Sequence, residues 1–224
     1  MPNLLKKLAF LLVIIACVSF AACTYRDPDI DKPAHELAKN GMDEFEEKDY
    51  GKSIVYFQKL RDWYPFSKFA ILAELKIADA HYKLRDYDDA IFAYEEFEEL
   101  HPNNEAIPYV VHQIGNCYFE QLDTIDRDQT PALKAIEAYD RLIKKYPDDP
   151  LSKDVLEKIR ICHKSLAENQ FYIGRFYYRT KHYESALARF QSVATTWSEF
   201  PEIQAKAFAF IELCEAAMME KDQN

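Results

Sequence analysis

The chain has 224 residues, of which 49% are hydrophobic, and its 38 acidic and 28 basic side chains give a formal net charge of −10. This acidic balance argues against nucleic acid or an anionic membrane surface as the main partner. The length suits one elongated domain with a continuous core.

The first 22 residues have the features of an export signal. Lys6 and Lys7 precede the apolar run 8–18, which is too short to span a bilayer comfortably, and Phe20-Ala-Ala-Cys23 follows. A cysteine directly after two small residues at the cleavage point is the bacterial lipobox arrangement. We therefore expect residues 1–22 to be removed and Cys23 to carry a covalent lipid that anchors the protein. An ordinary signal with an incidental cysteine is the alternative.

Residues 23–33 are expected to form a lipidated tether. Thr24 rather than aspartate follows the cysteine, which in the enteric sorting rule indicates the outer membrane. Asp27, Asp29 and Asp31 alternate along the segment, but the glycine and distal glutamate of a calcium-binding EF-hand loop are missing. A solvated linker is the expectation, with no metal site and no cofactor besides the lipid. Without its two signal lysines the chain has 26 basic and 38 acidic residues, a net charge of −12.

A sequence motif, here called the phrase, is repeated four times in the rest of the chain. Counted from Tyr50, Tyr87, Ala132 and Tyr183, a small residue follows at +3, an aromatic at +7, an apolar residue at +10 and usually a proline at +15. The copies are Ser53, Phe57, Leu60, Pro65; Ala90, Tyr94, Phe97, Pro102; Ala135, Tyr139, Leu142, Pro147; and Ala186, Phe190, Val193, Ser198. Gly41, Gly115 and Gly174 precede three of the copies at equivalent positions. Small residues allow two helices to approach closely, and the proline ends the second helix.

This pattern is that of tetratricopeptide repeats. It predicts an all-α fold, an α-solenoid of helical hairpins with a C-terminal capping helix. We expect the solenoid to cover residues 34–220, with repeats at about 34–66, 67–103, 104–148 and 151–200 and an amphipathic cap at 202–220. An unrelated helical bundle is the alternative.

Two departures from regular spacing are informative. In the third repeat the polar run 123–130 is inserted between the helices, ending in Thr130-Pro131 as an expected cap and first turn. In the fourth repeat the extra length precedes the first helix, which predicts one long helix over about 151–180.

No residues suggest catalysis. The six histidines make no HExxH motif, and no nucleophile elbow, phosphate loop or dinucleotide fingerprint occurs. Cys117, Cys162 and Cys214 lie within expected helices, so we expect buried free thiols, with a Cys117–Cys162 disulfide as the alternative. A binding protein rather than an enzyme is expected.

The chain resembles the BamD family of tetratricopeptide lipoproteins, which belong to the machinery that folds β-barrels into the outer membrane. The resemblance lies in the signal, the repeats, the Arg-Asp-Gln insertion at 127–129, the run 138–147 and the stretch Gly-Arg-Phe-Tyr-Tyr at 174–178. It implies a scaffold without chemistry of its own, lipid-anchored at the periplasmic face of the outer membrane.

The resemblance also implies partners. The C-terminal repeats of the family dock on the POTRA region of BamA, within a complex of further BAM subunits, and the N-terminal repeats receive unfolded outer-membrane β-barrel proteins. Arg189 matches the family's arginine in the second helix of the last repeat and is the first candidate for the BamA contact. Its alternative is an ordinary exposed arginine. Arg127 and Asp128 are further candidates, although a local ion pair that orders the loop is favoured for them.

Aromatic residues of the first two repeats are candidates for a substrate groove. They are Tyr64, Phe66, Phe69 and Tyr82. Three other functions stay open: a pilotin-like lipoprotein that helps a secretin assemble, a clamp for peptide carboxylates, and an envelope enzyme. The clamp is disfavoured because Ala38, Met42, Leu75 and Asp79 stand where lysine and asparagine would be needed.

Overall fold

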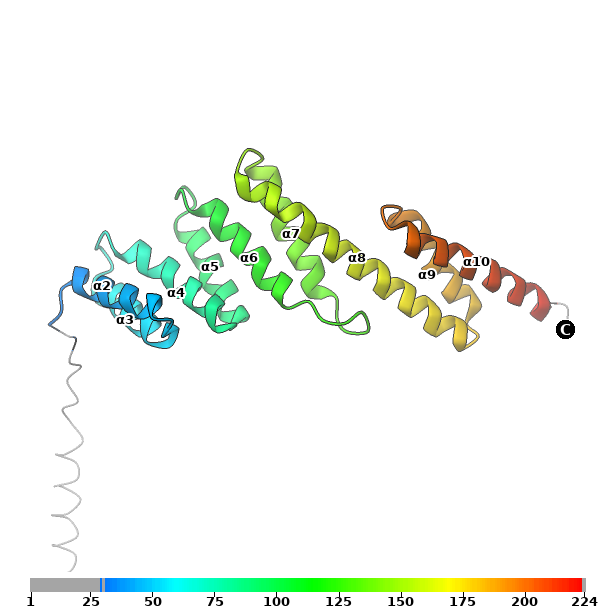
Figure 1. The fold of residues 1–224 in the computed structure, drawn as a ribbon, viewed down its shortest axis with the longest axis horizontal. Coiled ribbons are helices and arrows are strands. Elements are labelled where there is room, and N and C mark those ends of the chain that lie inside the picture. The colour runs from blue at the N-terminus through cyan, green and yellow to red at the C-terminus, as the bar shows by residue number, and fades with distance from the viewer. Residues whose placement is uncertain (1–28, 30, 223–224) are drawn as a thin grey trace, which may run out of the picture.

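The computed structural model describes residue 29 and residues 31–222 (Figure 1). All regular secondary structure in this part is helical. The first five helices are α2 (Ala34–Glu46), α3 (Tyr50–Trp63), α4 (Ala70–Leu84), α5 (Tyr87–Leu100) and α6 (Ile107–Glu120). The remaining four are α7 (Thr130–Lys145), α8 (Pro150–Arg179), α9 (Tyr183–Thr196) and α10 (Pro201–Asp222).

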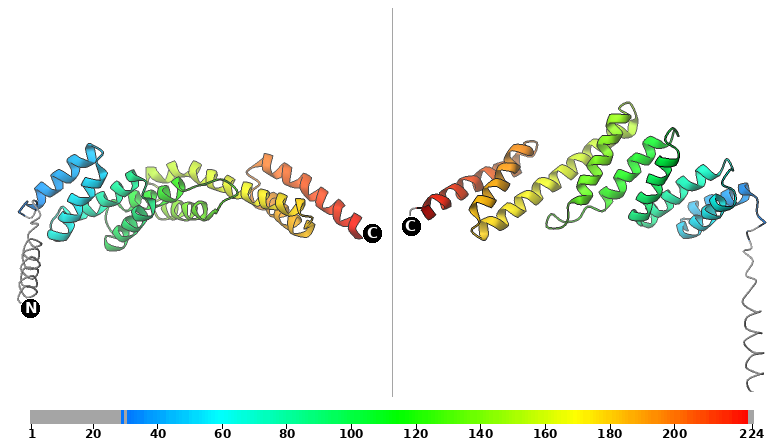
Figure 2. Two further views of the ribbon diagram at one scale, coloured as in Figure 1. Left: turned by 90° about the horizontal axis from the view of Figure 1, so that it is seen from below. Right: turned by 180° about the vertical axis from the view of Figure 1, so that it is seen from behind.

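The helices form a row of hairpins in chain order. Each helix packs mainly on the helix before it and the helix after it, and the row runs from α2 at one end to α10 at the other (Figure 1). Seen from below, the row bends into a shallow arc (Figure 2). The predicted fold class, an all-α solenoid of tetratricopeptide-like hairpins, is confirmed. Such a molecule presents long surfaces for binding rather than one enclosed site.

In the first, third and fourth hairpins, a glycine on the first helix lies against an aromatic ring of the second helix. A Cβ atom on Gly41 would lie 2.9 Å from two ring atoms of Phe57, and one on Gly115 would be closer still to Tyr139. The backbone of Gly41 is held here as well, because Ser53 Oγ donates a 2.8 Å hydrogen bond to its carbonyl. Interiors packed to this density leave no room for a larger residue at the glycine positions.

Three of the hairpin turns use a left-handed residue two positions before the repeated phrase starts. Lys48, Arg85 and Lys181 have φ angles of 65°, 64° and 62°. None is glycine, so each carries a conformational cost of about 1 kcal/mol. The third hairpin has the inserted loop instead of this short turn. The turn geometry therefore repeats wherever the hairpin is of regular length.

The buried side chains fall into three clusters along the row. The first joins α2, α3 and α4, the second extends from α4 to the first half of α8, and the third joins the second half of α8 to α9 and α10. On α8, Cys162 belongs to the second cluster and Ala167 to the third. The long helix therefore takes part in two packing units and connects them.

The last helix differs from the expected amphipathic cap. One side of α10 packs on α9 and buries Ile203, Ala207 and Cys214. Its other side also carries apolar residues, because Phe208 and Met219 are 52% and 65% exposed. The expectation of an amphipathic helix is therefore wrong, although α10 does pack on α9 as the last helix of the row, where a C-terminal capping helix was expected.

Candidate partner-binding surface

The loop inserted in the third repeat, residues 121–129, is fastened to the middle of α8. Asn169 Nδ2 donates a 2.7 Å hydrogen bond to the carbonyl oxygen of Ile125. Ser165 Oγ lies 2.7 Å from Oε1 of Gln129 and donates to it. The loop therefore has a defined position, beside the point where the second and third clusters meet on α8.

The favoured local ion pair between Arg127 and Asp128 is wrong. Instead, Asp128 Oδ1 accepts hydrogen bonds from the backbone N–H of Thr130 at 3.0 Å and from its Oγ1 at 2.9 Å. These bonds lower the pKa of the Asp128 carboxyl. Thr130 was expected to cap α7, but it is the first residue of that helix, and the carboxylate two residues earlier satisfies its free N–H. Among the described residues no ion pair holds Arg127.

Arg189 lies on α9, facing α8. Its Nη1 donates a 2.6 Å hydrogen bond to Oε1 of Gln170, and the side chain is half-buried. Arg189 has no ion-pair partner in the part of the chain that the structure describes. It borders an open hollow of about 370 Å³ lined by Tyr177, Ser185, Ala188 and Ser192. A guanidinium has five N–H donors, so most of its capacity to bind a carboxylate is unused here.

The inserted loop and Arg189 contact α8 at the same position along the helix axis. Asn169, which holds the loop, and Gln170, which holds Arg189, are consecutive residues of that helix. Successive residues of a helix point in directions about 100° apart. The inserted loop, which carries Arg127, and Arg189 therefore lie on different sides of α8 at the same position along its axis.

The four aromatic candidates for a substrate groove do not form one cluster. Tyr64 and Phe69 pack against the first cluster, whereas Tyr82 packs against the second and against Tyr87. Burial raises the pKa of Tyr82 to about 12. Phe66 is fully exposed, and it lies in the loop between α3 and α4 rather than on a helix face.

The structure also answers three questions about the chemistry of the chain: its cysteines, a possible metal site and a possible membrane-spanning helix. Cys117, Cys162 and Cys214 are free and buried, so the alternative disulfide is not formed. Over residue 29 and residues 31–222, no three histidine, cysteine or carboxylate side chains come together as a possible metal site. No helix in the same part combines the length and apolar composition needed to cross a membrane.

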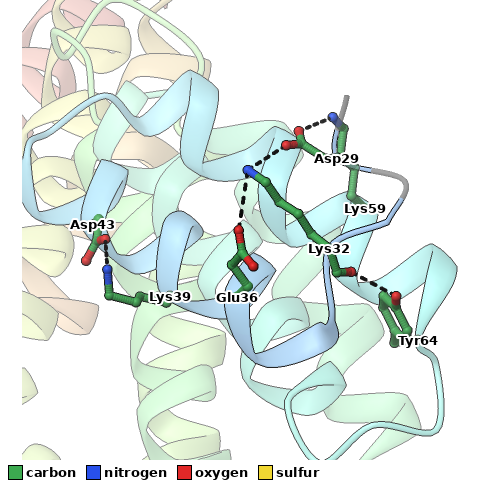
Figure 3. Close-up of polar contacts among 7 residues, drawn as sticks. All are labelled: Asp29, Lys32, Glu36, Lys39, Asp43, Lys59 and Tyr64. Atoms are coloured by element: carbon green, nitrogen blue, oxygen red, sulfur yellow. Dashed lines mark hydrogen bonds and ion pairs between the residues drawn. The ribbon is translucent and has the colours of Figure 1, made fainter. Parts of the chain in front are cut away.

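Sequence reasoning missed the attachment of the tether to the first hairpin. Asp29 is only 8% exposed, and it pairs with Lys32 and with Lys59 of α3 (Figure 3). The expectation of a wholly solvated linker is wrong at this residue. Asp27, the first of the three alternating aspartates, lies outside the described residues. Lys59 is 30 residues from Asp29 in the chain, so no local spacing indicates the contact.

These features define a helical-repeat protein with an inserted loop in its third hairpin and a lengthened helix in its fourth. Residues 30–223 match the family YfiO, described as an outer membrane lipoprotein. Because the match covers most of the chain, the chain belongs to this family.

Relatives named "Outer membrane protein assembly factor BamD" agree with this assignment. The one from Caulobacter vibrioides is 27% identical over 197 residues, which are 84% of this chain and 65% of the relative. The one from Pasteurella multocida is 24% identical over 210 residues, covering 89% of this chain and 80% of the relative. The chain thus spans just under two thirds of the Caulobacter protein. The resemblance to the BamD family is confirmed.

One solved structure gives a comparison at the level of the fold. The "TPR2AB-domain:pHSP90-complex of yeast Sti1" has a TM-score of 0.48 and 17% sequence identity, covering 84% of this chain and 71% of that one.

Proposed function

We propose that this protein is a non-enzymatic assembly factor of the outer membrane, acting as a scaffold in the machinery that inserts β-barrel proteins. The observation that carries the proposal is the match of residues 30–223 to the outer membrane lipoprotein family, together with relatives named as BamD. A row of stacked hairpins suits this role, because it offers separate surfaces to several partners.

The proposed anchor is a lipid on Cys23. The residues that would carry the signal lie outside the described part, so the proposal rests on the sequence: two small residues precede the cysteine after a short apolar run. Two or more acyl chains give stable membrane attachment, whereas one gives only marginal binding. The protein would then lie at the periplasmic face of the outer membrane.

The proposed surface for the BamA POTRA region is the C-terminal third of the row. Among the described residues Arg189 has no ion-pair partner and so supplies a cation, and Arg127 supplies another on the other side of α8. An incoming carboxylate could bind Arg189 with two parallel hydrogen bonds. Exposed apolar residues of α10 would add buried area, since Phe208, Leu213 and Met219 face away from the core. Asp128 supports this surface indirectly, by accepting hydrogen bonds from Thr130, the first residue of α7.

The proposed surface for unfolded barrel proteins is the N-terminal part of the row. Segments of an unfolded β-barrel carry apolar side chains, which need apolar partners. Helices α3 and α4 expose such residues, whereas most of the aromatic candidates are used in packing. The exposed residues are Val55, Ile71 and Leu72.

Co-purification tests the proposal. The native lipidated chain, solubilised in mild detergent and captured by an affinity tag, should carry BamA with it. Arg189→Ala should weaken that association, whereas Arg175→Ala, which removes an exposed arginine of α8, should not. Capture of a secretin without BamA would instead assign the protein to pilotin-like factors and overturn the proposal.

A further inference from the structure

The chain just before α2 is folded onto the first hairpin by a carboxylate between two lysines. Asp29 Oδ1 lies 2.7 Å from Lys32 Nζ, and Asp29 Oδ2 lies 2.6 Å from Lys59 Nζ (Figure 3). The Asp29 side chain is 12% exposed and that of Lys59 18% exposed. Ion pairs of this kind are less screened than surface pairs, so they hold the segment in one place. We call Asp29, Lys32 and Lys59, with Tyr64, the tether clasp.

A second contact closes the clasp at the end of α3. Tyr64 Oη donates a 2.8 Å hydrogen bond to the carbonyl oxygen of Lys32 (Figure 3). Both lysines also lie over aromatic rings, Lys32 over Tyr56 and Lys59 over Trp63, at 5.5 and 5.7 Å from the ring centres. Cation–π contacts add to the attraction when the cation is partly buried. The tether is therefore attached to the C-terminal half of α3 and to the residue that ends it.

The clasp limits how far this end of the row can lie from an anchor at Cys23. Asp29 follows Cys23 by six positions in the chain. A fully extended chain spans about 3.3–3.6 Å per residue, so the lipidated residue lies within about 20 Å of the clasp. This step rests on the lipidation proposed above. The end of α3 and the loop after it must then lie close to the membrane surface.

The loop at this place has the composition of a membrane-interface contact. It runs from Tyr64 to Phe69, between α3 and α4. Phe66 is 101% exposed, so the part of the chain that the structure describes does not cover its ring. Lys68 is exposed as well, with its ammonium 5.1 Å from the centre of the Phe69 ring. Aromatic rings and lysines with apolar stems are favoured at the boundary between lipid and water.

We propose that the tether clasp holds the α3–α4 loop against the periplasmic leaflet of the outer membrane, where Phe66 enters the lipid interface beside the anchor. The anchor and the loop then fix two points of the first hairpin. A lipid chain on a free tether would fix only one. The orientation of the row of repeats relative to the membrane surface would then be fixed. With the lipid anchor alone, the row could rotate about its point of attachment.

Depth-dependent fluorescence quenching tests the proposal on the full lipidated chain. An environment-sensitive fluorophore is placed on Phe66→Cys and, as the matched control, on Phe92→Cys, whose native side chain is 68% exposed but lies on α5. The native thiols of the folded domain are buried and do not compete for the label. On phosphatidylethanolamine vesicles with brominated acyl chains, the label at 66 should be quenched several-fold more than the label at 92.

The clasp itself is tested in the same assay. Asp29→Ala removes the carboxylate that both lysines bind, and it should reduce the quenching at 66 to the level of the label at 92. Asp43→Ala is the control, because it breaks the exposed Lys39–Asp43 pair on the same hairpin, 3.1 Å long, without touching the tether (Figure 3). It should leave the quenching unchanged. If Asp29→Ala leaves it unchanged too, the clasp does not position the loop.

Vesicle flotation distinguishes a failure of the membrane-contact proposal from a failure of the lipid-anchor proposal. If the parent chain does not float with vesicles, or if Cys23→Ala floats equally well, the lipidation proposal fails. If the parent floats but the label at 66 is unquenched, the membrane-contact proposal fails alone. A label at 66 that responds only when an unfolded barrel protein is added assigns Phe66 to substrate binding and also overturns the membrane contact.

Discussion

Gly174 on α8 and Phe190 on α9 are in direct contact: a Cβ atom on the glycine would lie 2.7 Å from Cε1 of the ring. The ring is fully buried, and it also stacks on Phe210 of α10 with 4.9 Å between ring centres. The contact therefore joins the last three helices, and neither partner can move away without disturbing a third element.

Gly174→Leu should destabilise the C-terminal hairpin. The larger side chain must displace Phe190, and overpacking of a well-packed core costs about 1–3 kcal/mol. Thermal and urea unfolding would measure this. Gly51→Ala is the control, because a Cβ there meets only Asp49 Oδ1 at 3.9 Å in the first turn of α3. It should be neutral or stabilising by up to about 1 kcal/mol. Equal unfolding curves for the two variants would contradict the packing described here.

Asp79 is a second position where stability should depend on one side chain. It is 5% exposed, its Oδ1 accepts from Tyr94 and Tyr109 at 2.7 and 2.8 Å, and its Oδ2 pairs with Lys76 at 2.8 Å. Asp79→Ala would leave two hydroxyls and an ammonium without their acceptor. We expect a loss of about 3 kcal/mol in the free energy of unfolding.

The exposed Asp88 of α5 provides the control for Asp79. Asp88→Ala removes a carboxylate from the first turn of its helix, where only a weak interaction with the helix dipole is lost, about 0.3–1 kcal/mol. Chemical unfolding of both variants gives the comparison. A cost for Asp79→Ala no larger than that for Asp88→Ala would show that the buried hydrogen bonds are dispensable.

The tether clasp should weaken in acid. Hydrogen bonds from Lys32 and then Lys59 are the main causes that lower the pKa of the Asp29 carboxyl below its usual value. Since the folded pKa is below the unfolded one, the clasp contributes stability above the unfolded value, about 3.9, and loses it as the pH falls through the folded pKa. The stability difference between the parent and Asp29→Asn should therefore shrink below about pH 4. A difference that stays constant from pH 7 to pH 3 would contradict the clasp.

The cysteines of the folded domain should resist alkylation. Burial raises the pKa of the Cys117 thiol to about 12 and that of Cys162 to about 11, so neither forms appreciable thiolate at pH 8. Mass spectrometry after iodoacetamide treatment should find these two residues unmodified in the native protein and fully modified in denaturant. Rapid native labelling of either residue, or a disulfide that joins them, would show that this part of the core is arranged differently.

The repeats could be predicted from the sequence because their determinants are local. Phe57 and Phe190 recur at one offset from each phrase start, and a proline follows three of the four phrases near the helix end. The contact between Asp29 and Lys59 could not be predicted, because it depends on how the tether crosses α3. The apolar outer face of α10 was missed for a different reason: its alanines and phenylalanines occur all round the helix, so the sequence does not show which side is covered.

The candidate site was only partly predictable. Arg189 and the inserted loop could be identified from the family resemblance. The hydrogen bonds that place them could not, because Gln170, which binds Arg189, and Asn169, which binds the loop, are polar residues of a long helix and belong to no motif. Among the aromatic residues, sequence alone could not separate Tyr64, which packs, from Phe66, which is exposed two residues later.

Reconstituted folding of a β-barrel protein tests the central claim most directly. Two preparations of proteoliposomes are made with the assembly machinery of the same organism, one with this lipidated chain and one without it. A urea-unfolded outer-membrane protein is then added to each. The folded fraction is then read from its heat-modifiable mobility on gels. The account predicts that folding falls severalfold when the chain is omitted and recovers when it is added back. Equal folding in both preparations would contradict it.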